Sequence, residues 1–181
     1  MVFSRIGMAG LIGLLCTLMA GASAQSTVAV QDGGFEGGTR QVGECSRVQG
    51  SLPMAWQDNS CWYAQSRVSY EAAIAPSRSG RSTKVVVSDG LFQLTQPVVL
   101  QPDAKYRVGV WVRAQQPMVV KLSLREAGAP YQEHGARSLL IGDEWTLLEV
   151  SAFTNGLWDR DTRQALFMVS SASRGTLWID D

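Results

Sequence analysis

Apolar residues recur at every second position in many short segments of this chain, and that period limits the fold more than any other feature of the sequence. The 3.6-residue period of an amphipathic helix is not kept over any window of about eleven residues, so we predict few helices. The alternating segments are rich in Val, Leu, Trp, Phe and Thr, which favour strands. They predict strands at Thr27–Val30, Arg67–Glu71, Thr83–Ser88, Leu91–Leu100, Lys105–Ala114, Met118–Glu126, Arg137–Ile141, Trp145–Phe153, Ala165–Ser171 and Thr176–Asp180.

Residues that favour tight turns separate these segments. They are Asp89-Gly90, Gln101-Pro102-Asp103, Gln116-Pro117, Ala129-Pro130, Gly142-Asp143 and Asn155-Gly156. About ten short antiparallel strands joined by such turns are typical of an all-β fold, either a β-sandwich or a closed barrel. No internal repeat or linker is visible, so one domain is expected.

The first 24 residues have the composition of a secretory signal peptide. Arg5 supplies a positive charge, residues 6–21 are uncharged and mostly apolar, and Ala22-Ser23-Ala24 forms a small-residue cleavage site before Gln25. A membrane anchor is the alternative, but the apolar run of about 16 residues is shorter than the roughly 20 that a spanning helix needs. We therefore expect residues 1–24 to be removed and residues 25–181 to form a secreted or periplasmic domain with no stable membrane span.

The charge balance excludes several classes of function. The chain has 16 Lys and Arg, 16 Asp and Glu and a single His. It therefore offers neither the basic surface of a nucleic-acid-binding protein nor a multi-histidine metal site. His134 follows Tyr131 in a segment marked by Gly and Pro, and we interpret it as a solvated loop residue.

Two cysteines, Cys45 and Cys61, remain after removal of the predicted signal peptide, which contains Cys16. An even pair in an exported chain favours a disulfide between them. Two separate buried thiols are the alternative.

The segments Lys105–Ala114 and Met118–Glu126 predict a hairpin that turns around Gln115–Pro117. Their alternating valines and leucines form one apolar face. The register that keeps this face together places three pairs on the opposite face, namely Trp111 with Lys121, Gly109 with Ser123, and Arg107 with Arg125.

That opposite face, which also carries Arg113, has the chemistry of a sugar-binding surface. Pyranose rings lie on aromatic faces through their C–H patches, and their hydroxyls need fixed polar partners. We predict that Trp111 is a stacking platform, and the arginines make an acidic polysaccharide one candidate ligand. An ordinary polar sheet face with Trp111 packed under a loop is the alternative.

Several motifs follow one another in a recognisable order. They are Gln31–Gly38, Trp56, Leu91–Gln96, Tyr106–Ala114 and Gly175–Asp181. Their order and spacing resemble carbohydrate-binding modules of families 4, 9 and 22, the CenC-like, galactose-binding-like jelly rolls commonly attached to secreted polysaccharide-degrading enzymes. The resemblance covers nearly all of residues 28–181. It implies a β-sandwich jelly roll that binds a polysaccharide or oligosaccharide without cleaving it, in association with glycoside hydrolase activity.

The resemblance also implies a structural calcium ion. In the family, the early glycine-rich segment and a late acidic pair come together around this ion. Here the corresponding ligands are Glu36 with Asp180 and Asp181, plus backbone carbonyls near Gly33–Gly37. Oxygen-only ligation suits calcium.

Two departures from the family pattern affect the site. The family's last strand usually continues past the acidic pair, whereas this sequence stops at Asp181, so we expect a truncated or separated module whose catalytic domain is elsewhere or lost. The segment Cys45–Cys61 is a local elaboration, which leaves both Trp56 and Trp62 as candidates for the family's first aromatic position. Trp111 best matches the aromatic residue on the strand of the central tyrosine.

Two alternatives from other classes stay open. A small jelly-roll glycoside hydrolase or polysaccharide lyase would need two carboxylates across a cleft. The candidates, which spacing alone does not pair, are Glu126, Glu133, Glu144, Glu149, Asp159 and Asp161. The other alternative is an extracellular β-sandwich that binds proteins.

Overall fold

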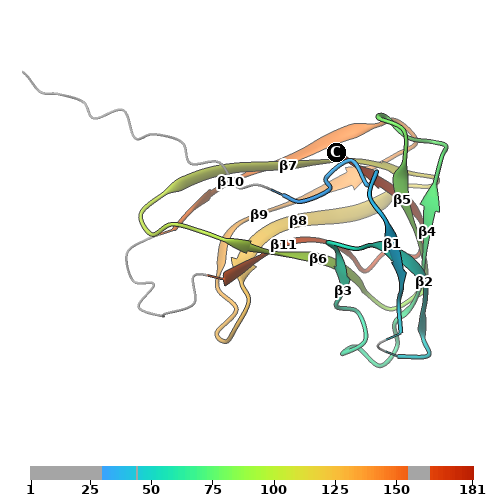
Figure 1. Ribbon diagram of the computed structural model, residues 1–181, viewed down its shortest axis with the longest axis horizontal. Coiled ribbons are helices and arrows are strands. Elements are labelled where there is room, and N and C mark those ends of the chain that lie inside the picture. Colours follow the sequence, from blue (N-terminus) through green and yellow to red (C-terminus); the bar gives the residue numbers. More distant parts are fainter. Residues whose placement is uncertain (1–29, 44, 155–163) are drawn as a thin grey trace, which may run out of the picture.

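The computed structural model describes residues 30–43, 45–154 and 164–181, and in these ranges the chain forms strands and no helix (Figure 1). The strands are β1 (Thr39–Gln41), β2 (Val48–Pro53), β3 (Gln57–Asp58), β4 (Arg67–Ala73), β5 (Ser82–Asp89), β6 (Phe92–Val99), β7 (Lys105–Ala114), β8 (Met118–Glu126), β9 (Glu133–Ile141), β10 (Thr146–Phe153), β11 (Gln164–Ser171) and β12 (Gly175–Asp180).

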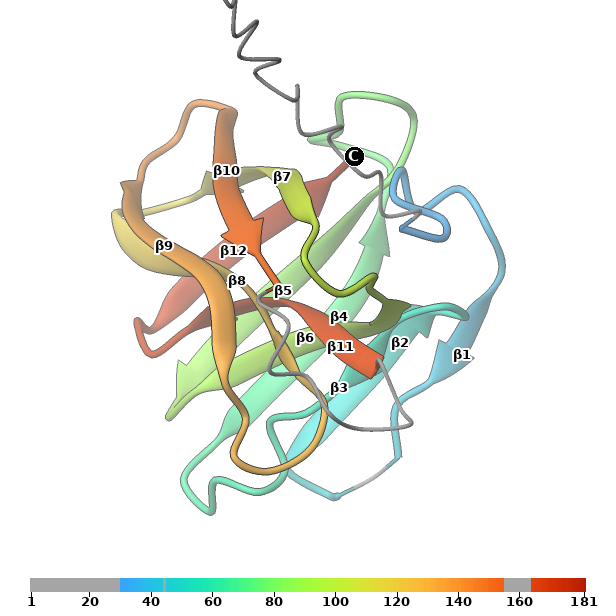
Figure 2. The ribbon, with the colours of Figure 1, turned by 90° about the vertical axis from the view of Figure 1, so that its left-hand side faces the viewer.

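The strands form two sheets that pack face to face, as the views in Figures 1 and 2 show. One sheet has seven strands in the order β1-β2-β4-β5-β12-β7-β10, and the other has five in the order β3-β6-β11-β8-β9. All pairings are antiparallel except the parallel pair of β2 and β4. The chain is therefore a β-sandwich, as the alternating pattern predicts.

The core lies between the sheets and is built from the apolar residues at alternate positions. Val108, Val110 and Val112 of β7 face Leu122 and Leu124 of β8 across this core, and all five are buried. Burial of apolar side chains on the inner faces of both sheets is the main stabilising contribution in such a sandwich.

Nine of the ten predicted strands are present, with ends shifted by a few residues. Most of the predicted strand Thr27–Val30 and all of the predicted signal peptide lie outside the described residues. The sequence did not predict β1, β2 or β3, because these strands are short or interrupted by Gly50 and Pro53 and show little alternation. Within the described ranges, no helix is long and apolar enough to span a bilayer.

The predicted hairpin of β7 and β8 is wrong. The two strands follow each other in the sequence but belong to different sheets: β7 pairs with β10 and β12, and β8 pairs with β9 and β11. Trp111 therefore lies opposite Leu147 and Asp180, not Lys121. Each strand does bury its predicted apolar face, so the two polar faces point away from each other on opposite sides of the sandwich.

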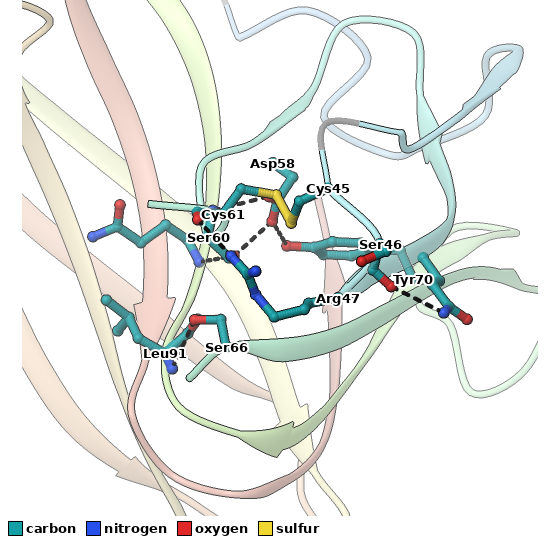
Figure 3. Close-up of a disulfide and its surroundings, with 11 residues drawn as sticks. Cys45, Ser46, Arg47, Asp58, Ser60, Cys61, Ser66, Tyr70 and Leu91 are labelled. Carbon is teal, nitrogen blue, oxygen red and sulfur yellow. Dashed lines mark hydrogen bonds between the residues drawn. A yellow bond between two sulfur atoms is a disulfide. The ribbon is translucent and has the colours of Figure 1, made fainter. Parts of the chain in front are cut away.

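Cys45 and Cys61 form the predicted disulfide, with their Cα atoms 6.0 Å apart (Figure 3). The bond joins the segment before β2 to the loop that follows β3. It therefore ties an edge of the seven-stranded sheet to an edge of the five-stranded sheet.

Candidate functional site

The outer face of the five-stranded sheet forms the floor of the candidate site. Cross-strand pairing places Gln93 of β6, Ser170 of β11 and Lys121 of β8 side by side. Leu166 of β11 and Arg125 of β8 form another pair, four residues along the two strands. Because side chains alternate along a strand, these residues point away from the core.

A cleft of about 520 Å³ opens over this floor. Its lining combines two aromatic rings, two side-chain amides, a guanidinium group and two aliphatic side chains. These belong to Asn59, Trp62, Gln93, Arg125, Ala127, Tyr131 and Leu166. The two aromatic residues come from the loop after β3 and the loop after β8, which extend from the same end of the molecule (Figures 1 and 2).

Trp62 forms one wall, and its side chain is 63% exposed. Its indole N–H donates to the Gln93 Oε1 at 3.1 Å, and the Asn59 side-chain amide donates to the same oxygen at 2.8 Å. The ring of Tyr63 packs edge-on against Trp62 with centroids 5.7 Å apart. Trp62 is thus oriented by the floor of the cleft while most of its ring stays open to solvent.

Buried polar groups hold the Trp62 loop in place (Figure 3). The carboxylate of Asp58 accepts hydrogen bonds from the Ser60 and Tyr70 hydroxyls, both at 2.6 Å. The Arg47 guanidinium donates to the Cys61 carbonyl at 3.0 Å, beside the disulfide. These bonds and the disulfide fix both the residue before Trp62 and the start of its loop.

Tyr131 forms the opposite wall and is 53% exposed. Its backbone has a φ of 60°, and its N–H donates to the Gly128 carbonyl at 2.7 Å, which closes a tight turn. The guanidinium carbon of Arg125 lies 5.1 Å from the centroid of the Tyr131 ring. This distance is within the range of a cation–π contact, so Arg125 supports the wall from the floor.

A β-bulge adjoins the site. The pairing of β8 with β9 shifts between Leu124 and Arg125, so that Leu124 lies opposite Gly135 and Arg125 lies opposite Glu133. His134 is the extra residue on β9. Bulges often redirect side chains next to functional sites.

The charged groups of the floor are unevenly paired. The Lys121 ammonium bonds the Glu133 carboxylate at 2.5 Å. Arg125 has no ion pair in the part of the chain that is described, and its Nε is buried without a hydrogen-bond partner. The buried Ser123 hydroxyl, between these two residues on β8, also lacks a partner.

The structure separates the predicted binding residues into three groups. Trp62, Lys121, Ser123 and Arg125 share the cleft or its floor. Trp111 and Arg113 lie on the outer face of the seven-stranded sheet, where the Arg78 guanidinium carbon is 3.6 Å from the Trp111 ring centroid. That cation covers one ring face which a sugar would need.

Trp56 belongs to the third group, the core. Its side chain is 1% exposed and packs between the rings of Phe35 and Phe167, with centroid distances of 5.2 and 5.7 Å. A ring enclosed in this way presents no face to a ligand, so the packing of Trp56 does not support its predicted place in the carbohydrate site.

The predicted calcium ligands gather around the loop of residues 77–81. The Glu36 carboxylate accepts from the Arg81 N–H at 2.6 Å, and the buried Asp180 carboxylate accepts from the Arg78 N–H at 2.5 Å. Asp181 lies within 3.9 Å of the Arg78 guanidinium. Among the described residues no three Asp, Glu, His or Cys side chains are placed to hold a metal ion, since these carboxylates point at N–H donors. A calcium ion would have to displace those donors, and it stays a prediction.

His134 is half-buried on β9 and is not the solvated loop residue that the sequence suggested. It lines a separate cavity of about 450 Å³ with Lys105, Tyr106 and Phe153 among others. Burial lowers the pKa of His134 below its usual 6.5, and the charge of Glu126 opposes this shift.

Sequence reasoning missed Asn59, Gln93, Tyr131 and Leu166 as site residues. Gln93 lies in a segment that matched the family pattern, but its side-chain direction depends on the sheet to which β6 belongs. For Tyr131 the available signal is an aromatic residue in a loop next to Gly128 and Pro130. Such residues are often exposed.

No family model matches this chain, and no curated protein sequence matches it either. Its fold is similar to the solved structure of a family 4 carbohydrate-binding module (TM-score 0.60, 14% identity, 84% of this chain and 96% of that one). It is also similar to a Stig cyclase, Fisc from Fischerella sp. TAU (0.61, 12%, 84% and 93%). A third similar structure is TmCBM61 in complex with β-1,4-galactotriose (0.50, 18%, 71% and 86%). The jelly roll expected from the sequence is therefore confirmed as a fold.

Proposed function

We propose that this chain binds a saccharide, without cleaving it, in the cleft between Trp62 and Tyr131. The observation that carries the proposal is that one cavity is lined by two exposed aromatic rings and by the side-chain amides of Asn59 and Gln93. The rings supply apolar faces for pyranose C–H groups, and Asn59 and Gln93 supply donors and acceptors for hydroxyls. Two of the similar folds belong to carbohydrate-binding modules, one of them solved with a galactotriose.

The lining of the cleft supports binding rather than hydrolysis. Glycoside hydrolysis uses two carboxylates on either side of the scissile bond. In the described ranges the cleft is lined by no Asp or Glu, and Glu133 at its edge is engaged by Lys121. Incubation with a bound polysaccharide should therefore release no reducing sugar.

The setting we propose is extracellular or periplasmic, beside a polysaccharide-degrading enzyme. The disulfide fits an oxidising compartment, and the sequence predicts a leader that would deliver the chain there. A module that only binds would serve by holding such an enzyme on its substrate.

Affinity electrophoresis in gels that contain single polysaccharides would test the proposal. Trp62→Ala and Tyr131→Ala should each weaken retardation by about tenfold or more, since the loss of a stacking ring at a binding hot spot costs a few kcal/mol. Both side chains are more than half exposed, so the melting temperature should change little. Trp111→Ala is the comparison variant, because the sequence pattern assigned the platform to Trp111, and it should bind like the unmodified protein. Retardation lost with Trp111→Ala but kept with Trp62→Ala would place the site on the other sheet.

A further inference from the structure

We infer that the saccharide bound in the cleft is acidic and that Arg125 pairs with the carboxylate of a uronic acid. This inference rests on the proposed function and adds the chemical class of the ligand. It starts from the uneven pairing of charges on the floor.

Arg125 is the only charged residue among those that line the cleft in the described part of the chain. Its guanidinium has no ion-pair partner there, although β8 and β9 pairing places Glu133 directly opposite. Glu133 instead bonds the Lys121 ammonium. Taken together, the three side chains leave one net positive charge, and it is on Arg125.

The other nearby carboxylates do not compensate this charge. Asp58 precedes the lining residue Asn59, but it pairs with Leu94, whose side chain is in the core, and its oxygens accept bonds from Ser60 and Tyr70. Glu126 follows Arg125 on β8 and pairs with the buried Ala165, so its side chain points to the opposite side of the strand from Arg125. Within residues 30–43, 45–154 and 164–181, Arg125 is thus a cation without an anionic partner that faces a cavity of about 520 Å³.

The surroundings of Arg125 favour a planar anion. A guanidinium group presents its N–H donors in a fixed fork that matches a carboxylate. Contact with the Tyr131 ring limits the orientations of that fork, with the guanidinium carbon 5.1 Å from the ring centroid. A sugar ring that stacks on a wall of the cleft has one edge toward the floor, and a carboxylate at the C5 position on that edge can reach Arg125.

The test compares ligands that differ only in their carboxylates. Polygalacturonate, alginate and glucuronoxylan are each titrated beside their carboxyl-reduced forms, at low and at high salt, with the mature full-length protein. At low salt, the affinity for at least one acidic form should be at least about ten times the affinity for its reduced form. High salt should lower this ratio of affinities, because it screens the charge on Arg125. Arg125→Gln should reduce this ratio to near one. Because the substitution also removes the contact with the Tyr131 ring, the ratio of the two affinities, and not the affinity for either form alone, is the readout.

Matched variants separate the role of Arg125 from net charge. Arg107→Gln removes the same charge from the other sheet, where Arg107 pairs with Glu149 at 2.8 Å, and should leave the preference intact. Glu133→Gln should strengthen the preference for the acidic form, because it removes the nearest competing carboxylate. Arg125→Lys keeps the charge but loses the fork, and should retain part of the preference; melting curves establish that each variant is folded.

Equal binding of acidic and reduced forms by the unmodified protein would overturn the inference and leave the proposed function standing. A preference that survives Arg125→Gln in a folded variant would also overturn it. Binding of no saccharide of either kind would reject the proposed function and this inference together.

Discussion

Single residues decide which outer face of the sandwich is open to a ligand. Trp62 and Trp111 are both tryptophans on an outer surface, yet Trp62 donates from its ring edge to Gln93 and remains 63% exposed. Trp111 carries the Arg78 guanidinium on one face. The two residues are of the same type, so the side chain next to each ring determines whether a ligand can reach it.

Arg78 is held over Trp111 by a buried carboxylate, and this contact can be tested. Asp180 is fully buried and accepts from the Arg78 N–H and from both the N–H and the hydroxyl of Ser79. Asp180→Ala would leave these donors without an acceptor and should lower the free energy of unfolding by about 2–4 kcal/mol. Urea unfolding measures this change in the free energy of unfolding, with a chelator present so that calcium does not contribute. A loss below about 1 kcal/mol would mean that water replaces the carboxylate.

Calcium binding by Glu36, Asp180 and Asp181 stays a prediction from the family resemblance. A cation held by three carboxylates would relieve their mutual repulsion, so added calcium should raise the melting temperature of chelator-treated protein. At a free calcium concentration of about 100 times the dissociation constant, binding would raise the free energy of unfolding by roughly 2.7 kcal/mol. Glu36→Ala should abolish the calcium-dependent part of the shift. Identical melting curves with calcium and with chelator would show that the protein does not bind calcium here. The acidic residues would then serve only to accept hydrogen bonds from the loop of residues 77–81.

His134 gives the fold a predicted pH dependence. Burial holds its pKa below the unfolded value of 6.5, so the unfolded chain takes up the proton more readily than the folded one. The contribution to stability is therefore complete above about pH 6.5 and is lost as the pH falls toward the folded pKa. In urea melts at several pH values between 7.5 and 5, His134→Gln should flatten this decline. The same slope in both proteins would assign the decline to other groups.

At the scale of strands, the sequence pattern locates most elements but not their partners. Alternation in β7 and β8 correctly identifies which side chains enter the core. It says nothing about pairing, because a strand buries the same face whichever neighbours it has. Consecutive strands pair in most folds, and the hairpin prediction relied on that tendency. Here the chain crosses to the other sheet between Ala114 and Met118.

The same limit explains how much of the candidate site the sequence could provide. Lys121, Ser123 and Arg125 share one face of β8, as the alternation along the strand predicts. Joining them to Trp111 required a pairing that does not exist. Tyr131 and Gln93 enter the site only through the five-stranded sheet and its loops, and no local pattern shows that arrangement.

The disulfide is the element that connects stability with binding. It closes a loop with a sequence separation of 16, and the chain-entropy model assigns such a loop about 3 kcal/mol. Replacing Cys45 and Cys61 together by Ser should lower the stability by about that amount. It should also weaken saccharide binding, because Trp62 directly follows Cys61. Full retention of affinity in a folded double variant would show that the bonds of Asp58 and Arg47 suffice to hold the loop.

At the scale of the whole molecule, removal of the predicted signal peptide determines where the exported protein begins. We expect the exported protein to begin at Gln25, since Ala22 and Ala24 occupy the positions that a signal peptidase reads. The intact mass of the exported form should match residues 25–181 with the disulfide closed. A stable form that keeps Met1–Ala24 would identify this segment as an anchor instead.

The contrast between the open Trp62 and the enclosed Trp56 has an optical consequence. Trp56, at 1% exposure, should emit at short wavelength and resist quenching by iodide, whereas Trp62, at 63%, should emit at longer wavelength and be quenched readily. A saccharide seated against Trp62 would exclude water and iodide from that indole and leave Trp56 unchanged. The chain has six tryptophans, so the difference between the spectra of the unmodified protein and of Trp62→Ala isolates the emission of Trp62. That difference makes Trp62 a fluorescent reporter of the cleft.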